Sequence, residues 1–162
     1  VLEIKYFKTS IEIIIKFTMK KILFGLLILL SNLGFAQEWQ YDFDKAKKTA
    51  TAEDKPIIVV FSGSDWCAPC IKLDRNVWQS EAFKKEASNW ILVRADFPRK
   101  KANELSKEQT EHNQKLAEKY NLEGSFPLVI VMDKNGKVIA KMGFKNVSPE
   151  EYIKMIYTQI EK

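Results

Sequence analysis

Continuously apolar runs alternate with amphipathic segments along the body of the chain. Phe43–Asp54 places apolar residues at helical spacing without an internal Gly or Pro, which predicts a helix. Ile57–Phe61 is a continuous, largely β-branched apolar run with the length of a buried strand. The runs Ile91–Ala95 and Leu128–Met132 have the same character and predict two further strands.

Helical patterns fill the gaps between these strands. A helix is expected to open near Cys67 and to run through Val77. Pro69 fits its first turn, because the N–H that proline lacks has no partner there. Two further segments have helical character, namely Ser80–Ala87 and Ser106–Tyr120. The polar stretch between 96 and 107 predicts a surface loop.

The end of the chain carries a hairpin signal and a helix start. The dipeptide Asn135-Gly136 predicts a tight turn into a strand at Val138–Met142. Ser148 and Glu151 form a capping-box pattern around Pro149, which predicts the last helix. Because the early strands need crossover helices, they are predicted to be parallel, whereas the hairpin is antiparallel. The fold class is therefore α/β, a central mixed sheet flanked by helices.

The N-terminal region has the pattern of an export signal. Lys20 and Lys21 precede the apolar run Ile22–Leu30, and small residues stand at Gly34 and Ala36. This order is typical of a secretory signal peptide, with cleavage after Ala36. The protein is then expected to be periplasmic or secreted, where disulfides form and persist.

The boundaries follow from that pattern. Residues 19–36 are predicted to be the signal peptide and 37–162 a single domain. Residues 1–18 are interpreted as an upstream extension that is not native, because Met19 is the preferred start. The alternative is an uncleaved membrane anchor, for which the apolar run is short against the roughly 20 residues of a spanning helix.

Composition narrows the possible functions. Of the formal charge of +5, the first 36 residues hold +3 and the remainder only +2, so nothing favours nucleic-acid binding. Two cysteines and one histidine are too few for a closed four-ligand zinc site, and no metal or cofactor is expected. Two cysteines also cannot form the framework of a disulfide-rich scaffold.

The string Trp66-Cys67-Ala68-Pro69-Cys70 carries the candidate chemistry. It follows a predicted buried strand and opens a helix. Disulfide exchange needs a thiolate, and the N–H groups and dipole of a helix start favour one at Cys67. Cys70, one turn further, can bond Cys67 or attack a mixed disulfide held on it. A structural disulfide and half of a metal site are the alternatives.

The segment Val59-Val60-Phe61-Ser62-Gly63-Ser64-Asp65-Trp66-Cys67-Ala68-Pro69-Cys70 resembles the active-site strand and helix of the thioredoxin superfamily, in particular its exported bacterial members. Gly124-Ser125-Phe126-Pro127-Leu128 resembles the cis-proline loop, and Gly143 matches a family glycine after the last strand. The resemblance implies a thioredoxin-like fold. Cys67 would attack and Cys70 would resolve. Pro127 would be cis and face the cysteines, and the Phe126 backbone would pair with an extended substrate.

One position departs from the family pattern. The family often places a buried acid six residues before the first cysteine, where it moves a proton, and this chain has Phe61 there. Asp65 lies nearer in sequence but is expected to be exposed in its turn. Proton transfer is therefore assigned to water or to an unidentified residue.

Other residues receive structural or surface roles. Trp66 is predicted to cover the cysteines and contact partners, with simple packing as the alternative. Trp78 and Trp90 are predicted core residues, and His112 a solvated surface residue. The basic run Arg99–Lys101 is predicted to be a solvated loop, with partner docking as the less favoured alternative.

The sequence thus favours an exported, monomeric thiol–disulfide oxidoreductase that acts on disulfides or thiols of protein substrates. Pro69 resembles the reducing members of the family, so reduction is the favoured direction. Reduction in an oxidising compartment requires electrons, which implies a membrane electron donor. The alternatives are a disulfide oxidase or isomerase on the same site, and a non-catalytic binding module in which Cys67 and Cys70 form a structural disulfide.

Overall fold

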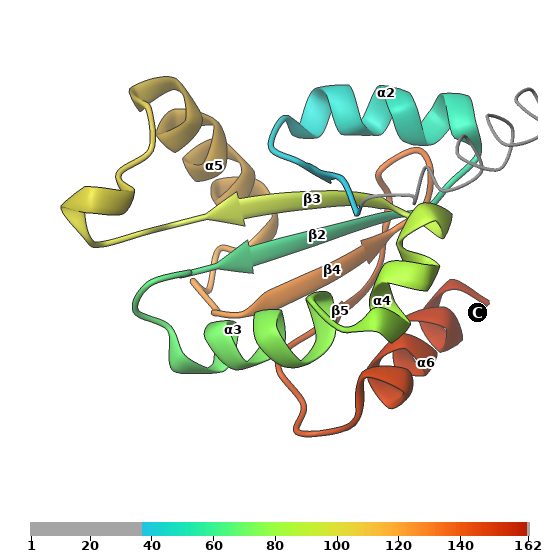
Figure 1. Ribbon diagram of the computed structural model, residues 1–162. Helices are drawn as coiled ribbons and strands as arrows, with labels where there is room; N and C mark the ends of the chain where they lie inside the picture. The colour runs from blue at the N-terminus through green and yellow to red at the C-terminus, as the bar shows by residue number, and fades with distance from the viewer. Residues whose placement is uncertain (1–36, 162) are drawn as a thin grey trace, which may run out of the picture. The chain divides into compact units, whose positions relative to one another are not determined.

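The structure, a computed structural model, describes residues 37–161. The predicted signal peptide 19–36 and the extension 1–18 lie outside the described residues. A five-stranded sheet in the order β1-β3-β2-β4-β5 forms the centre (Figure 1). Its strands are β1 (Trp39–Gln40), β2 (Ile57–Ser62), β3 (Ile91–Asp96), β4 (Leu128–Met132) and β5 (Val138–Met142).

Strand directions confirm the predicted mixed sheet. β1 and β2 both pair with β3 in parallel, whereas β4 runs antiparallel to β2 and β5 antiparallel to β4. β2 lies in the middle of the sheet and all six of its residues are buried, which explains its continuous apolar run. β5 lies at the edge and alternates half-buried with exposed residues.

Helices cover both faces of the sheet (Figure 1). α2 and α5 lie on one face, and α3, α4 and α6 on the other. The α-helices are α2 (Phe43–Glu53), α3 (Ala68–Leu73), α4 (Glu81–Glu86), α5 (Lys107–Tyr120) and α6 (Pro149–Ile160). Shorter helical turns are η1 (Asp74–Trp78), η2 (Ala87–Asn89) and η3 (Lys101–Asn103). No helix within residues 37–161 is long and apolar enough to span a bilayer.

Alternate residues of β2 contribute to two separate cores. Ile58 and Val60 belong to the core beneath α3, α4 and α6, whereas Val59 and Phe61 belong to the core beneath α2 and α5. The predicted core residues Trp78 and Trp90 are 2% and 3% exposed. The cysteine turn therefore follows directly on β2, a strand that is packed on both of its faces.

Three local features differ from the sequence prediction. β1 is only two residues long, which is too short to produce a recognisable sequence pattern. It is held in the sheet by its parallel pairing with β3. The helix predicted from Cys67 through Val77 is α-helical to Leu73 and then continues as the π-helical η1. The loop predicted from 96 to 107 contains the single helical turn η3. The capping box at Ser148 and the antiparallel hairpin are as predicted.

Candidate active site

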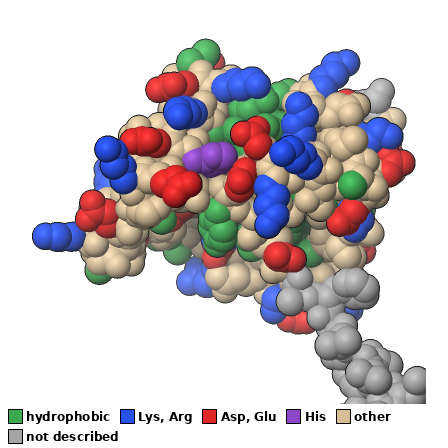
Figure 2. All heavy atoms as spheres, turned by 90° about the horizontal axis from the view of Figure 1, so that it is seen from above, with side chains coloured by type: hydrophobic (Ala, Val, Ile, Leu, Met, Phe, Trp, Pro, Cys, Tyr) green, Lys and Arg blue, Asp and Glu red, His purple; other side chains and the backbone are tan. Residues whose placement is uncertain are grey.

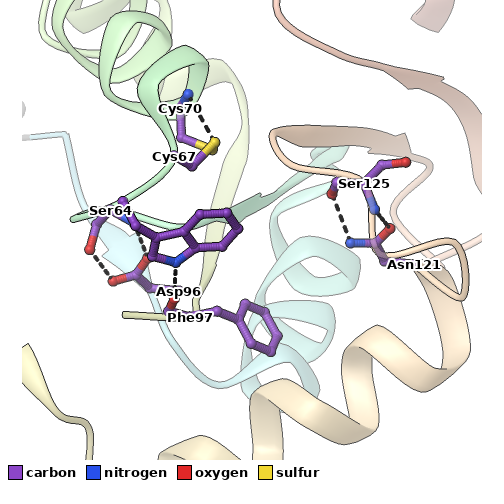
Figure 3. Close-up of a disulfide and its surroundings, with 8 residues drawn as sticks. Ser64, Cys67, Cys70, Asp96, Phe97, Asn121 and Ser125 are labelled. Carbon is purple, nitrogen blue, oxygen red and sulfur yellow. Dashed lines mark hydrogen bonds between the residues drawn. A yellow bond between two sulfur atoms is a disulfide. The ribbon is translucent and has the colours of Figure 1, made fainter. Parts of the chain in front are cut away.

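Cys67 and Cys70 are joined in a disulfide at the start of α3 (Figure 3). β2 ends at Ser62, and the tight turn that follows is closed by the Cys67 N–H donating to the Gly63 carbonyl at 2.9 Å. Cys67 is the N-cap residue, and its Sγ accepts a hydrogen bond from the Cys70 N–H at 3.3 Å. Cys67 is 5% exposed and Cys70 is 3% exposed. The structure thus places both cysteines at a helix start, and both are buried.

Trp66 joins the cysteine turn to two neighbouring loops. Its half-buried indole donates from Nε1 to the Phe97 carbonyl at 2.7 Å. The Arg99 guanidinium lies 3.7 Å from the ring centroid, in a cation–π contact. On the side of the cis-proline loop, the Phe126 ring packs edge-on against Trp66, with the two ring centroids 5.5 Å apart. Arg99 is solvent-exposed, as predicted for the basic run, but it packs on the tryptophan next to Cys67.

Two carboxylates tie the cysteine turn to the loop after β3. Asp96, the last residue of β3, accepts from the Ser64 N–H at 2.9 Å and from the Ser64 hydroxyl at 2.6 Å (Figure 3). In the reverse direction, Asp65 in the turn accepts from the N–H groups of Arg99 and Lys100 at 2.9 and 3.0 Å. Each segment therefore anchors the other, and hydrogen bonds run in both directions between the cysteine turn and the loop after β3.

Asp65 corrects one expectation. It is half-buried rather than exposed, and the Asn103 amide also donates to it at 2.9 Å. The Arg99 N–H holds the pKa of the Asp65 carboxyl below its usual value, with the Asn103 amide adding to the effect. A carboxylate held ionised by loop donors is a structural anchor and does not replace the missing buried acid.

The position of the usual buried acid is fully apolar. Phe61 is 0% exposed, and its ring stacks on that of Phe97 with the ring centroids 6.5 Å apart. No group of three or more His, Cys, Asp or Glu side chains that could hold a metal ion occurs in residues 37–161.

His112 also departs from its prediction. It is half-buried, and its Nε2 accepts a hydrogen bond from the Phe43 N–H at 3.1 Å, which joins α5 to the first residue of α2. Figure 2 shows this histidine on the outer face of the α2 and α5 layer, among interspersed basic and acidic side chains. Its role is to cap the N-terminus of α2, and not that of a freely solvated residue.

The cis-proline loop has the implied backbone conformation. The Phe126–Pro127 peptide bond is cis, and Pro127 is buried. The buried Asn121 side chain bonds to the Ser125 backbone just before this bond (Figure 3). No motif in the sequence marks Asn121 or Asp96, because the contact of Asp96 joins separate loops and that of Asn121 depends on how its own turn folds.

The fold, the disulfide at a helix start and the neighbouring cis-proline loop define the class of thioredoxin-like redox proteins. The thioredoxin-like family matches residues 38–134, and the chain therefore belongs to this family of thiol–disulfide oxidoreductases.

Particular relatives agree with this class. The disulfide bond reductase DsbH of Chlamydia pneumoniae is 34% identical over 125 residues, which cover 76% of this chain and 73% of the relative. A solved structure of a DsbH oxidoreductase superposes with a TM-score of 0.70 at 33% identity, covering 76% of this chain and 84% of that one. The C-terminal domain of Neisseria meningitidis DsbD in its reduced form shares the fold, with a TM-score of 0.53, 23% identity and coverage of 72% and 93%.

Proposed function

We propose that the protein is exported and reduces disulfide bonds in protein substrates, with Cys67 as the attacking and Cys70 as the resolving residue. The observation that carries this proposal is the hydrogen bond from the Cys70 N–H to the Cys67 Sγ at the N-cap of α3. In the reduced protein the same N–H and the positive end of the helix stabilise a thiolate at Cys67.

The proposed reaction proceeds in two exchanges. The Cys67 thiolate attacks one sulfur of the substrate disulfide, forms a mixed disulfide and releases the other substrate sulfur as a thiolate, which takes up a proton. Cys70 then loses its proton and attacks the Cys67 Sγ, which frees the second substrate thiolate. Two electrons have passed from the protein to the substrate, and the product is the Cys67–Cys70 disulfide seen in the structure.

The surroundings of the cysteines support protein substrates. The Phe126 backbone directly precedes the cis bond to Pro127 and is proposed to pair with an extended substrate segment. Trp66 contacts Phe126 across the site and is proposed to form the adjoining wall of the substrate surface. With Phe61 in place of a buried acid, we propose that the proton of Cys70 is taken up by water or by a residue other than a carboxylate at that position.

Reduction is the proposed direction. Pro69 precedes Cys70, as in the reducing members that the sequence resembles, and the 34% identical relative is a disulfide bond reductase. Each turnover leaves the protein oxidised, so a dithiol reductant must restore it. We propose that a membrane electron donor supplies these electrons, because an oxidising compartment does not.

Brief alkylation of the reduced protein tests the assigned roles. Cys67 should react with iodoacetamide well before Cys70, because it holds the helix-start position that favours the thiolate. Their nearly equal burial, 5% and 3%, means that exposure cannot produce this order by itself. Fragment mass spectrometry of the peptide carrying both cysteines locates the label. Earlier labelling of Cys70 would reverse the proposed roles.

Export is proposed from the signal pattern of residues 19–36. The mature protein is expected to begin at Gln37, immediately after the small residue Ala36. Intact-mass measurement of the protein recovered from the cell envelope of its own organism gives the N-terminus directly. A chain that keeps residues 19–36 and stays in the membrane fraction would support the anchor alternative.

A further inference from the structure

The end of α5 is tied to the cis-proline loop by one side chain. Asn121, the C-cap residue of α5, is only 5% exposed, and its backbone N–H donates to the Ala117 carbonyl at 2.8 Å. Its side-chain Oδ1 accepts from the Ser125 N–H at 2.9 Å, and its Nδ2 donates to the Ser125 carbonyl at 3.0 Å (Figure 3). The carboxamide therefore occupies both backbone hydrogen-bonding groups of Ser125, much as a neighbouring strand would.

The turn that brings these groups together is itself tight. The Gly124 N–H donates to the Asn121 carbonyl at 2.9 Å, and Gly124 has a φ of 63°, a left-handed conformation that suits glycine. Ser125 is exposed to solvent although its backbone is fully bonded. Its backbone groups are therefore occupied by an internal partner, even though the residue is exposed to solvent.

The next residue differs in this respect. Within residues 37–161 the backbone N–H and C=O of Phe126 have no hydrogen-bond partner, and pairing with β2 begins only at Leu128. Pro127 has no N–H to offer. Among Ser125, Phe126 and Pro127, Phe126 alone carries both a backbone donor and a backbone acceptor without an internal partner, and its ring contacts Trp66 beside Cys67.

We infer that Asn121 is a positioning residue that sets the register of the substrate. By blocking Ser125, it restricts backbone pairing to Phe126, and so fixes which substrate residue lies opposite the cysteines. By anchoring the loop to α5, it also holds the Phe126 backbone at a constant place beside Trp66. This inference rests on the proposed function, and extends it to substrates that present an extended peptide backbone around their disulfide.

The test compares two oxidised substrates in single-turnover reactions with the reduced protein. One is a synthetic extended peptide disulfide, and the other is bis(2-hydroxyethyl) disulfide, which has no peptide backbone to pair. Asn121→Ala should slow reduction of the peptide about tenfold, which is the effect expected when one hydrogen bond between protein and substrate is lost. Reduction of the small disulfide should change by less than about twofold, since its chemistry needs only the cysteines.

Two further variants separate positioning from stability. Asn121→Asp keeps the size of the side chain and the acceptor for the Ser125 N–H but sets a carboxylate oxygen against the Ser125 carbonyl. It should lower the peptide rate and leave the small-disulfide rate within about twofold of wild type, and that second rate shows that the cysteine site is still folded. Asn113→Ala truncates the other buried asparagine of α5, which is 1% exposed and donates to the Asp96 carbonyl. It should leave the ratio of peptide rate to small-disulfide rate unchanged.

A methylated peptide makes the coupling explicit. N-methylation of the backbone amide next to the peptide's reactive cysteine removes a donor that would pair with Phe126. This change should slow the wild-type protein strongly and Asn121→Ala much less, because the variant has already lost the register. Independent, multiplying effects of the two changes would overturn the inference, as would equal slowing of both substrates by Asn121→Ala. A wild-type protein that reduces neither disulfide would instead contradict the proposed function.

Discussion

Replacing Cys70 with alanine should convert the protein into a trap for its substrates. Cys67 can still attack a substrate disulfide, but the mixed disulfide then lacks the second thiol that releases it. Adducts that disappear on reduction should therefore accumulate, and turnover should be almost abolished. The helix start stays intact, because Cys67 and not Cys70 is the N-cap residue. Non-reducing electrophoresis of the variant, expressed in its own cell envelope, measures the adducts.

Cys67→Ala is the matched control for this experiment. It leaves Cys70 in place within α3, 3% exposed, and should give few adducts. A structural disulfide would behave differently, because either substitution would remove the same cross-link and lower stability to a similar extent, commonly by a few kcal/mol. If Cys70→Ala produces no more adducts than Cys67→Ala, the binding-module alternative replaces the enzyme.

The second large effect is expected at Gly63. A Cβ at this position would lie 2.4 Å from Trp66 Cε2 and 2.6 Å from Cζ2 and Nε1. The indole cannot move aside freely, because it donates to the Phe97 carbonyl and is covered by Arg99. Gly63→Ala should therefore lower the free energy of unfolding by about 2 to 4 kcal/mol, from overpacking together with a weakened hydrogen bond. Urea denaturation of the oxidised protein measures the change.

Gly143→Ala is a suitable comparison. Its added Cβ would have the Pro127 carbonyl oxygen at 3.5 Å as its nearest contact, which is an ordinary distance. Gly143→Ala should therefore change the free energy of unfolding by no more than about 1 kcal/mol. Trp66→Phe replaces the indole with a smaller ring. Combined with Gly63→Ala, it should lower the free energy of unfolding by less than the sum of the two single changes. Equal stabilities for the two glycine variants would show that the Trp66 ring is not fixed as described.

The sequence predicted most of the fold because its signals are local. The apolar runs that became β2 and β4 are buried along their whole length, and a continuous run is what such strands require. The capping box at Ser148 is contained within four residues and appears as predicted. The two-residue β1 gave no such signal, since it is held by pairing with β3 and by the packing of Trp39 on Trp78, and both contacts involve distant parts of the sequence.

The site was predictable only in part, for the same reason. The cysteine pair and the cis-proline corner lie in contiguous stretches that resemble a known family. Asp65 and Asp96 act across more than 30 positions of sequence, and each bonds to main-chain N–H groups that no residue type reveals. Asn121 bonds to Ser125 only four residues away, but asparagine after a helix is common enough that its role appears only in three dimensions.

The reduction potential of the Cys67–Cys70 pair tests the central proposal most directly. Equilibration of the protein with a dithiothreitol redox buffer, read by mass after alkylation, gives this value. For a reductant of protein disulfides we expect a potential near that of thioredoxin, about −270 mV. A potential below about −300 mV would mark a structural disulfide and contradict catalysis, whereas one near −120 mV would contradict the reducing direction and favour an oxidase.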